Sequence, residues 1–172
     1  MKPITDETAW LQQSIGNWRY ELATLDERGS CAIITTGTER VWPLGDMWVV
    51  AENVGEAADG SPTLSLTTIG FEPARQRFTG SVATTMVPVL FTLDGAIDRA
   101  TNALQLRTKG PALTVTKGTD RYRDVHRIID SGTRELIAEV RAADGQWRAF
   151  MRTQYNRWTG ESLQSANDSQ GD

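Results

Sequence analysis

The stretch Gly16-Asn17-Trp18-Arg19-Tyr20-Glu21-Leu22 decides the fold of this chain. From Trp18 onward, its large apolar residues alternate with the charged residues Arg19 and Glu21. A period of two is the pattern of a strand that has one buried face and one wet face. The segment therefore predicts a half-buried β-strand that begins at residue 16.

The segment before this strand, residues 5 to 15, is predicted to be a helix. Thr5 or Asp6 can cap its N-terminus, and Glu7 carries the negative charge that the positive end of a helix dipole favours. Its apolar residues form a rough stripe, and Gly16 ends the helix. This is the only good helix that the sequence predicts.

Alternation with period two continues in short segments, which are separated by turn sequences such as Leu44-Gly45-Asp46 and Asp144-Gly145. The further strands are expected at about residues 35 to 43, 46 to 55, 62 to 71, 75 to 86, 88 to 96, 102 to 109, 119 to 130, 134 to 141 and 146 to 157. A long antiparallel meander avoids exposed edges by closing on itself. The predicted fold is all-β: an antiparallel up-and-down β-barrel of about ten strands with a short N-terminal helix.

Length and charge restrict the classes of function. With 172 residues the chain is expected to form one barrel domain over residues 1–158, followed by a disordered polar tail over residues 159–172. The net charge of −4 argues against a nucleic-acid partner. A single cysteine provides no disulfide framework, and the sequence shows neither a signal-peptide pattern nor a membrane-spanning run. We therefore expect a cytoplasmic protein with no nucleic-acid partner and no membrane partner.

Several motifs occur in a fixed order along the chain. They are Trp10-Leu11-Gln12-Gln13 ahead of Gly16-Asn17-Trp18, Gly37-Thr38-Glu39-Arg40-Val41, Leu44-Gly45-Asp46-Met47-Trp48-Val49-Val50, Thr68-Ile69-Gly70-Phe71-Glu72-Pro73-Ala74-Arg75 and Tyr122-Arg123-Asp124-Val125. Together they resemble the bacterial domain-of-unknown-function family 1579, from about residue 8 to residue 157. The resemblance implies a lipocalin-like (calycin) barrel with a leading helix and brings no established activity. Phe71-Glu72 departs from the family, which more often has Tyr-Asp there.

The resemblance to calycin barrels also implies a structural role for Gly16, Trp18 and Arg157. In such barrels the tryptophan of the Gly-x-Trp motif closes the narrow end, and an arginine of the last strand lies over its indole in a cation–π contact. Arg157 ends the last expected strand and is the best-placed arginine, with Arg152 second. We expect this group to close the barrel and to bind no ligand.

The barrel interior is where a functional site is expected, because alternate residues of each strand face inward. Arg121, Arg123 and Arg127 share a face suited to solvent, so His126 is expected to point inward with Tyr122 and Asp124. The same alternation is expected to point Trp48 and Glu52 inward. Arg40 is expected either to point inward or, like Glu39, to form a cross-strand charge pair on the outer face. Buried charged groups either pair or line a wet cavity. The predicted ligand-binding residues are Arg40, Trp48, Glu52, Met86, His126, Met151 and Tyr155.

The sequence lacks the residues that common catalytic and metal sites require. One histidine and one cysteine cannot supply a zinc site, and a hydrolytic triad would have only His126 as its base. We therefore predict no catalytic residues, no metal and no cofactor. Haem is the cofactor alternative, because nitrobindins, which this fold resembles, hold haem through one histidine. Only His126 could serve here, and it lies outside the C-terminal strand expected to carry that ligand.

The favoured hypothesis is a small-molecule binding protein that holds an apolar or amphipathic ligand in the barrel cavity. Two alternatives stay open: an isomerase or lyase that uses His126 or Glu52 as general base in the same cavity, and a structural or interaction barrel with a filled core. A dry, filled centre would favour the last of these. The segment Val87-Pro88-Val89-Leu90-Phe91 is apolar on both faces, which favours a homodimer packed through the barrel walls.

Overall fold

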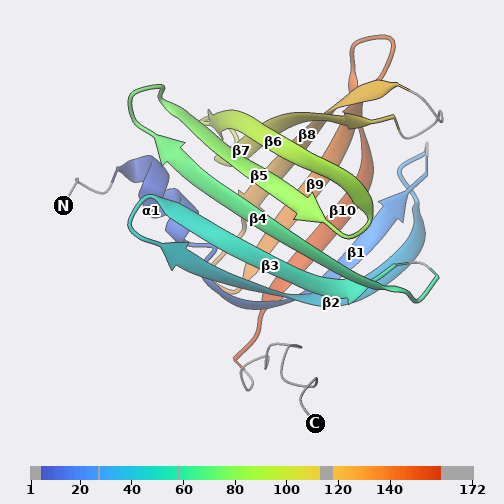
Figure 1. Ribbon diagram of the computed structural model, residues 1–172, viewed down its shortest axis with the longest axis horizontal. Coiled ribbons are helices and arrows are strands. Elements are labelled where there is room, and N and C mark those ends of the chain that lie inside the picture. Colours follow the sequence, from blue (N-terminus) through green and yellow to red (C-terminus); the bar gives the residue numbers. More distant parts are fainter. Residues whose placement is uncertain (1–4, 27, 58, 113–117, 160–172) are drawn as a thin grey trace.

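The computed structural model describes residues 5–26, 28–57, 59–112 and 118–159. In these residues, ten antiparallel strands close into a barrel in which β1 pairs with both β2 and β10 (Figure 1). The elements are α1 (Asp6–Gln12), β1 (Gly16–Leu25), β2 (Cys31–Leu44), β3 (Trp48–Glu56), β4 (Pro62–Glu72), β5 (Arg77–Thr84), β6 (Val87–Asp98), β7 (Ala103–Pro111), β8 (Thr119–Ile128), β9 (Thr133–Arg141) and β10 (Trp147–Arg157). The predicted fold class is confirmed. The tail expected to be disordered, apart from Thr159, lies outside the described residues.

Helix α1 begins where the sequence predicts and ends earlier. Thr5 is the N-cap, since its hydroxyl accepts a hydrogen bond from the Thr8 backbone N–H at 3.2 Å, and the Thr8 side chain in turn accepts from the Thr5 N–H at 2.8 Å. The helix ends at Gln12 instead of residue 15. The backbone N–H groups of the next three residues form hydrogen bonds of the i to i−3 type, and their carbonyl groups accept hydrogen bonds from the side chains of Trp18 and Arg157. The α-helical ladder therefore does not continue.

Helix α1 covers one end of the barrel, which we call the base (Figure 1). Its residues Trp10 and Leu11 are buried in the core. Glu7 forms an ion pair of 3.0 Å with Arg99, which lies in the β6–β7 turn. The Gln12 side chain donates to the backbone carbonyl of Asp46, in the β2–β3 turn, at 3.4 Å. The helix is therefore tied to turns at the base, and the opposite end, which we call the mouth, carries the β3–β4 and β5–β6 turns.

The largest buried side chains lie near the base. Trp18, Phe78 and Leu104 are each only 1% exposed. They stand near the starts of β1, β5 and β7, and in an antiparallel meander the odd-numbered strands all start at the same end. The apolar core therefore fills the base, and the interior above it is lined by smaller or polar residues.

Two inward-facing glycines make room for Tyr20 inside the barrel. A Cβ atom on Gly37 or Gly55 would overlap the Tyr20 hydroxyl. The Tyr20 ring also lies 5.7 Å, between centroids, from the ring of Tyr155 across the β1–β10 pair. Tyr20 thus spans from β1 toward β3, and the glycines are required because any larger residue would displace it.

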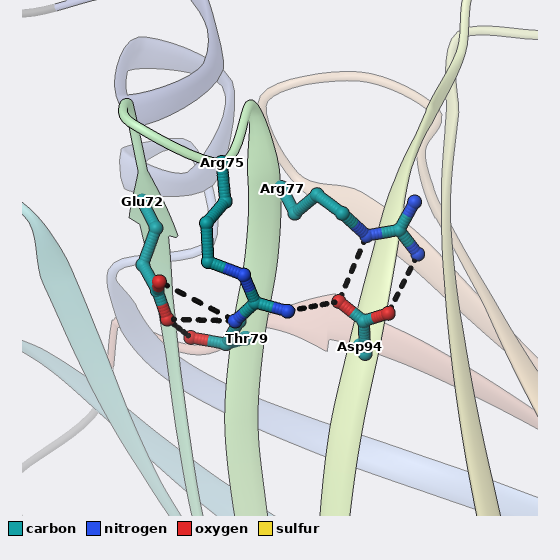
Figure 2. A network of polar contacts seen from close by, with 5 residues as sticks. All are labelled: Glu72, Arg75, Arg77, Thr79 and Asp94. Atoms are coloured by element: carbon teal, nitrogen blue, oxygen red, sulfur yellow. Dashed lines mark hydrogen bonds and ion pairs between the residues drawn. The ribbon is translucent and has the colours of Figure 1, made fainter.

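A polar network on the outer face joins β4, β5 and β6 (Figure 2). Arg77 binds Asp94 through two hydrogen bonds of 2.8 and 2.7 Å, and this contact lowers the pKa of Asp94. Thr79 donates to Glu72 at 2.7 Å, which is the main cause of the lowered pKa of Glu72. Arg75, from the turn, contacts Glu72 at 3.3 Å and Asp94 at 3.7 Å. The Phe71–Arg75 motif therefore contributes to cross-strand ties on the surface.

Apolar side chains also occur on the outer face. Val54, Leu64 and Leu66, on β3 and β4, are between 43% and 45% exposed. These exposed residues are consistent with the expectation of a homodimer, which stays a prediction.

Within the described residues, no helix is long and apolar enough to cross a membrane.

Candidate functional site

A cavity of about 440 Å³ occupies the barrel interior above the base. Cavities of this size hold small organic molecules, for which sites of about 300–1,000 Å³ are typical. The base-side lining is aliphatic and includes Leu11, Val41, Val49, Ile69, Leu93 and Leu104. Toward the mouth the walls of β1 to β5 carry short polar side chains, namely Thr24, Thr35, Asn53, Thr63, Ser65 and Thr84. The interior is therefore open and amphipathic.

Trp18 and Arg157 meet at the base, as the calycin resemblance implies. The Arg157 guanidinium carbon lies 4.2 Å from the centroid of the Trp18 ring. Arg157 also donates to the backbone carbonyls of Gln13 and Ile15 at 3.2 and 2.8 Å, and the Trp18 indole donates to that of Ser14 at 2.8 Å. These bonds satisfy carbonyl groups that follow the last turn of α1, where a cation is also favoured by the helix dipole.

A second arginine lies against Trp18 inside the barrel. The guanidinium carbon of Arg134, on β9, is 4.6 Å from the Trp18 ring centroid and 3.9 Å from that of Tyr155. Its Nη2 atom forms an ion pair with Glu39 of β2, and both side chains are less than a tenth exposed. Removal from water is costly for each charge, so the two depend on one another and on the aromatic rings.

Burial shifts the pKa values of this group. It lowers the pKa of Arg134 to about 10, and it raises the pKa of Tyr155 to about 12. At neutral pH Arg134 is therefore cationic and Tyr155 is a neutral phenol. The base thus presents a charge-balanced ion pair and a hydroxyl group to the lower cavity, without net charge.

The β8 wall of the cavity carries two titratable residues that the spacing of the arginines on this strand predicted to face inward. Asp124 and His126 line the cavity, and both are half-buried. On the opposite face, Arg123 pairs with Glu139 and lies 4.7 Å from the Trp147 ring centroid, while Arg121 is exposed. Neither Asp124 nor His126 has a side-chain hydrogen bond within the described part of the chain. Their polar atoms are therefore left to water or to a guest.

The apolar surroundings favour the uncharged form of both residues. Burial, with a smaller contribution from the Glu139 carboxylate, raises the pKa of Asp124 to about 7. Burial lowers the pKa of His126 to about 4. Near pH 7 the imidazole is therefore neutral, and the carboxyl group is close to the midpoint of its titration. Strongly shifted titratable groups in a cleft are a common feature of functional sites.

The structure brings four of the predicted ligand-binding residues to the cavity. His126 and Tyr155 line its inner part, and Met151 lies on the β10 wall. Met86 also lines the cavity but is 66% exposed, which places it at the mouth. Their role in binding stays a prediction.

The inward orientation predicted for Arg40, Trp48 and Glu52 is wrong. The residues that alternate with them, including Val49 and Ala51, line the cavity, so these three side chains lie on the outer face. Arg40 and Glu52 stand opposite one another in the β2–β3 pair. The outer face of these strands also carries apolar residues such as Trp48, which packs on Gly70, so the hydrophobic pattern could not separate the two faces.

Sequence reasoning missed Glu39, Arg134 and Trp10 as interior residues. Glu39 and Arg134 are charged, and a charged residue in an alternating strand is normally assigned to solvent. Trp10 lines the cavity from the helix, and its indole nitrogen has no hydrogen-bond partner among the described residues. The one available signal was pairing: a carboxylate and a guanidinium can enter a barrel together when each satisfies the other.

Over the described residues, no three His, Cys, Asp or Glu side chains gather as a metal site requires. Cys31 is exposed and free of a disulfide. His126 is the one imidazole in the chain, and Asp124 is its inward-facing neighbour on β8.

Comparison with known families identifies the chain. The family model described as "protein of unknown function (DUF1579)" matches residues 4–157. The chain belongs to this family. No curated protein matches it.

Solved structures similar to this DUF1579 protein include designed barrels. A redesigned β-barrel, mFAP0, bound to DFHBI, has 10% sequence identity and a TM-score of 0.47 over 85% of this chain and 100% of that chain. A de novo designed fluorescence-activating β-barrel has 12% identity and a TM-score of 0.46 over 86% of this chain and 95% of that chain.

Replacing the base tryptophan should destabilise the fold. Trp18→Ala removes a side chain that is 1% exposed and in contact with two arginines. We expect a loss of about 3–5 kcal/mol in the free energy of unfolding and loss of cooperative unfolding. Thermal and urea denaturation followed by circular dichroism measure both. An unchanged melting temperature would show that Trp18 does not close the barrel.

Breaking the buried ion pair should be nearly as costly. Glu39→Gln leaves the Arg134 charge buried without its counter-charge, which should cost about 3–5 kcal/mol in urea denaturation. The double variant Glu39→Leu with Arg134→Met should recover most of that loss, because two apolar residues replace two charges. Glu52→Gln on the outer face is the control and should change stability by no more than about 0.5 kcal/mol. Equal effects of Glu39→Gln and Glu52→Gln would contradict the buried pair.

The two residues of the β8 wall should give opposite pH dependences of stability. The folded pKa of Asp124, about 7, lies above its ordinary value of 3.8, so its contribution to stability is full below pH 4 and is lost as the pH rises to 7. The folded pKa of His126, about 4, lies below 6.5, so its contribution is full above pH 6.5 and is lost as the pH falls to 4. Between pH 4 and 6.5 the two slopes offset one another.

Single substitutions should separate the two contributions to the slope of the free energy of unfolding against pH. Relative to the unmodified protein, Asp124→Asn should make the free energy of unfolding rise with pH over this range, and His126→Gln should make it fall. The slope should change by up to about 1.4 kcal/mol per pH unit in each case. Urea denaturation at pH 4.5, 5.5 and 6.5 measures these slopes. Parallel curves for all three proteins would mean that neither group is shifted.

Proposed function

We propose that this barrel is a small-molecule binding protein that holds a largely apolar ligand in its central cavity. The observation that carries the proposal is the open interior of about 440 Å³, bounded by a packed base and lined by both apolar and polar side chains. A purely structural barrel of this size would be expected to fill its centre with side chains. Leaving this space open forgoes packing energy, and a bound ligand would restore it.

The polar side chains of the cavity wall support a ligand that is held in one orientation. Apolar pockets gain orientation and specificity from a few polar groups at fixed positions. Here Asp124 and His126 stand on one wall, two residues apart on β8, and Thr153 and Tyr155 lie on the nearby β10. The aliphatic lining elsewhere suits the apolar body of the ligand. The polar part of the ligand would then contact the β8 wall.

His126 is the residue through which this orientation is best tested. A neutral imidazole offers one hydrogen-bond donor and one acceptor, and neither has a partner within the described residues. His126→Ala should therefore weaken ligand binding about tenfold, the effect of losing one good hydrogen bond in a site of low polarity. Arg121→Ala is the matched control, because Arg121 is exposed on the same strand and faces solvent.

The experiment has two parts. Native mass spectrometry of protein purified gently from its own host should show a retained molecule of a few hundred daltons. Displacement of an apolar fluorescent dye by that molecule then gives affinities for the unmodified protein, His126→Ala and Arg121→Ala. Equal weakening by both substitutions would contradict the role of His126. A protein that retains no molecule and takes up no dye would contradict the proposed function.

A further inference from the structure

We propose that the ligands of this cavity are amphipathic organic cations, molecules with an apolar body and one protonated amine that pairs with the Asp124 carboxylate. This inference rests on the proposed function and specifies the chemical class of the ligand. It is carried by the position of one unpartnered carboxyl group in a cavity whose nearby arginines already contact other carboxylates.

Asp124 faces the cavity without a cationic partner. No hydrogen bond or ion pair joins its carboxyl group to any residue in the described part of the chain. The residues opposite it in the sheet are Leu106 on β7 and Ala138 on β9, and neither carries a polar side chain. The carboxyl group is therefore left to water or to a ligand, and a cationic ligand would also offset its charge.

The arginines around this wall are already paired with carboxylates. Arg134 is matched by Glu39 at the base, and Arg123 is matched by Glu139. Arg127, which also lines the cavity, and Arg152 share the carboxylate of Glu135. These ion pairs leave no basic side chain aimed at Asp124, so a cation for it must come from the ligand.

The remaining charges near Asp124 favour a cation further. On β9, the carboxylate of Glu139 makes a smaller contribution than burial to the raised pKa of Asp124. On β8 itself, His126 is neutral because burial lowers its pKa to about 4. Tyr155 on β10 is a neutral phenol, and Arg107 on β7 acts on Asp94 of the outer face. Glu56 adds an exposed carboxylate at the mouth.

A protonated amine would satisfy this site, whereas an anion would not. The ammonium group donates to the Asp124 carboxylate, and its charge offsets the carboxylate charge in an apolar environment. Binding then draws a proton from Asp124, so the affinity for an amine increases as the pH rises through the titration of that residue. A ligand carboxylate would instead be repelled by Asp124 and Glu139.

Three probes with one apolar body test the ligand class. They are 4-phenylbutylamine, 4-phenylbutanol and 4-phenylbutyrate, and isothermal titration calorimetry at pH 6 and pH 8 gives their affinities. At pH 8 the amine should bind at least tenfold more tightly than the alcohol and the carboxylate. Its affinity should fall by up to about tenfold at pH 6, where Asp124 is mostly protonated. The alcohol should show little change with pH.

Two variants locate the effect. Asp124→Asn should abolish the preference for the amine and its pH dependence. Glu52→Gln removes an acidic residue from the outer face of β3, outside the cavity lining, and should retain both. Head-group preference and pH dependence in the unmodified protein test the proposal even if Asp124→Asn is poorly folded.

The outcomes separate this inference from the proposed function. Equal binding of the three probes, or tightest binding of the carboxylate, would overturn the cationic ligand and leave a binding cavity in place. An amine preference that persists in Asp124→Asn would also overturn it. Failure of all three probes to bind would contradict the inference, and retention of a host molecule in native mass spectrometry would then show that the proposed function still stands.

Discussion

The structure depends on the packing of Trp18 against two guanidinium groups at the base of the barrel. Arg157 reaches the ring from the end of β10 and holds the segment after α1, while Arg134 contacts it from β9. Arg134 can be buried there only because Glu39 pairs with it. This arrangement fills the base with aromatic and charged groups and ties the helix to the sheet. The open cavity begins where that packing ends.

The cavity wall on β8 differs from the base in how its polar groups are satisfied. At the base, positive and negative charges are matched within the protein. On β8, Asp124 and His126 have no side-chain hydrogen-bond partners among the described residues. Burial raises the pKa of Asp124 and lowers the pKa of His126, and both changes favour the uncharged side chain. A site that leaves polar groups unsatisfied in apolar surroundings is poorly suited to a structural role and well suited to a guest that completes them. We therefore propose distinct roles for the two halves of the interior: closure of the barrel at the base and ligand recognition on β8.

The sequence predicted the elements of the barrel well because its turns and its alternation are regular. It also oriented β8, since three arginines mark the outer face there. It failed on β2 and β3, where Trp48 and Val50 are apolar and yet face outward, so hydrophobicity did not distinguish the two sides. The burial of Glu39 and Arg134 could not be inferred from either strand alone, because each charge is tolerated only through a partner seven strands away along the chain.

Titration of the Asp124 carboxyl carbon, followed by ¹³C nuclear magnetic resonance in the unmodified protein, is the most direct test of ligand recognition on the β8 wall. An unpartnered carboxyl group in the apolar cavity should titrate with a pKa of about 7. Addition of saturating 4-phenylbutylamine should move that midpoint downward, because the ammonium group stabilises the carboxylate. A midpoint near 4 in the free protein, unchanged by the amine, would show that Asp124 is hydrated or paired and would contradict the proposed recognition wall.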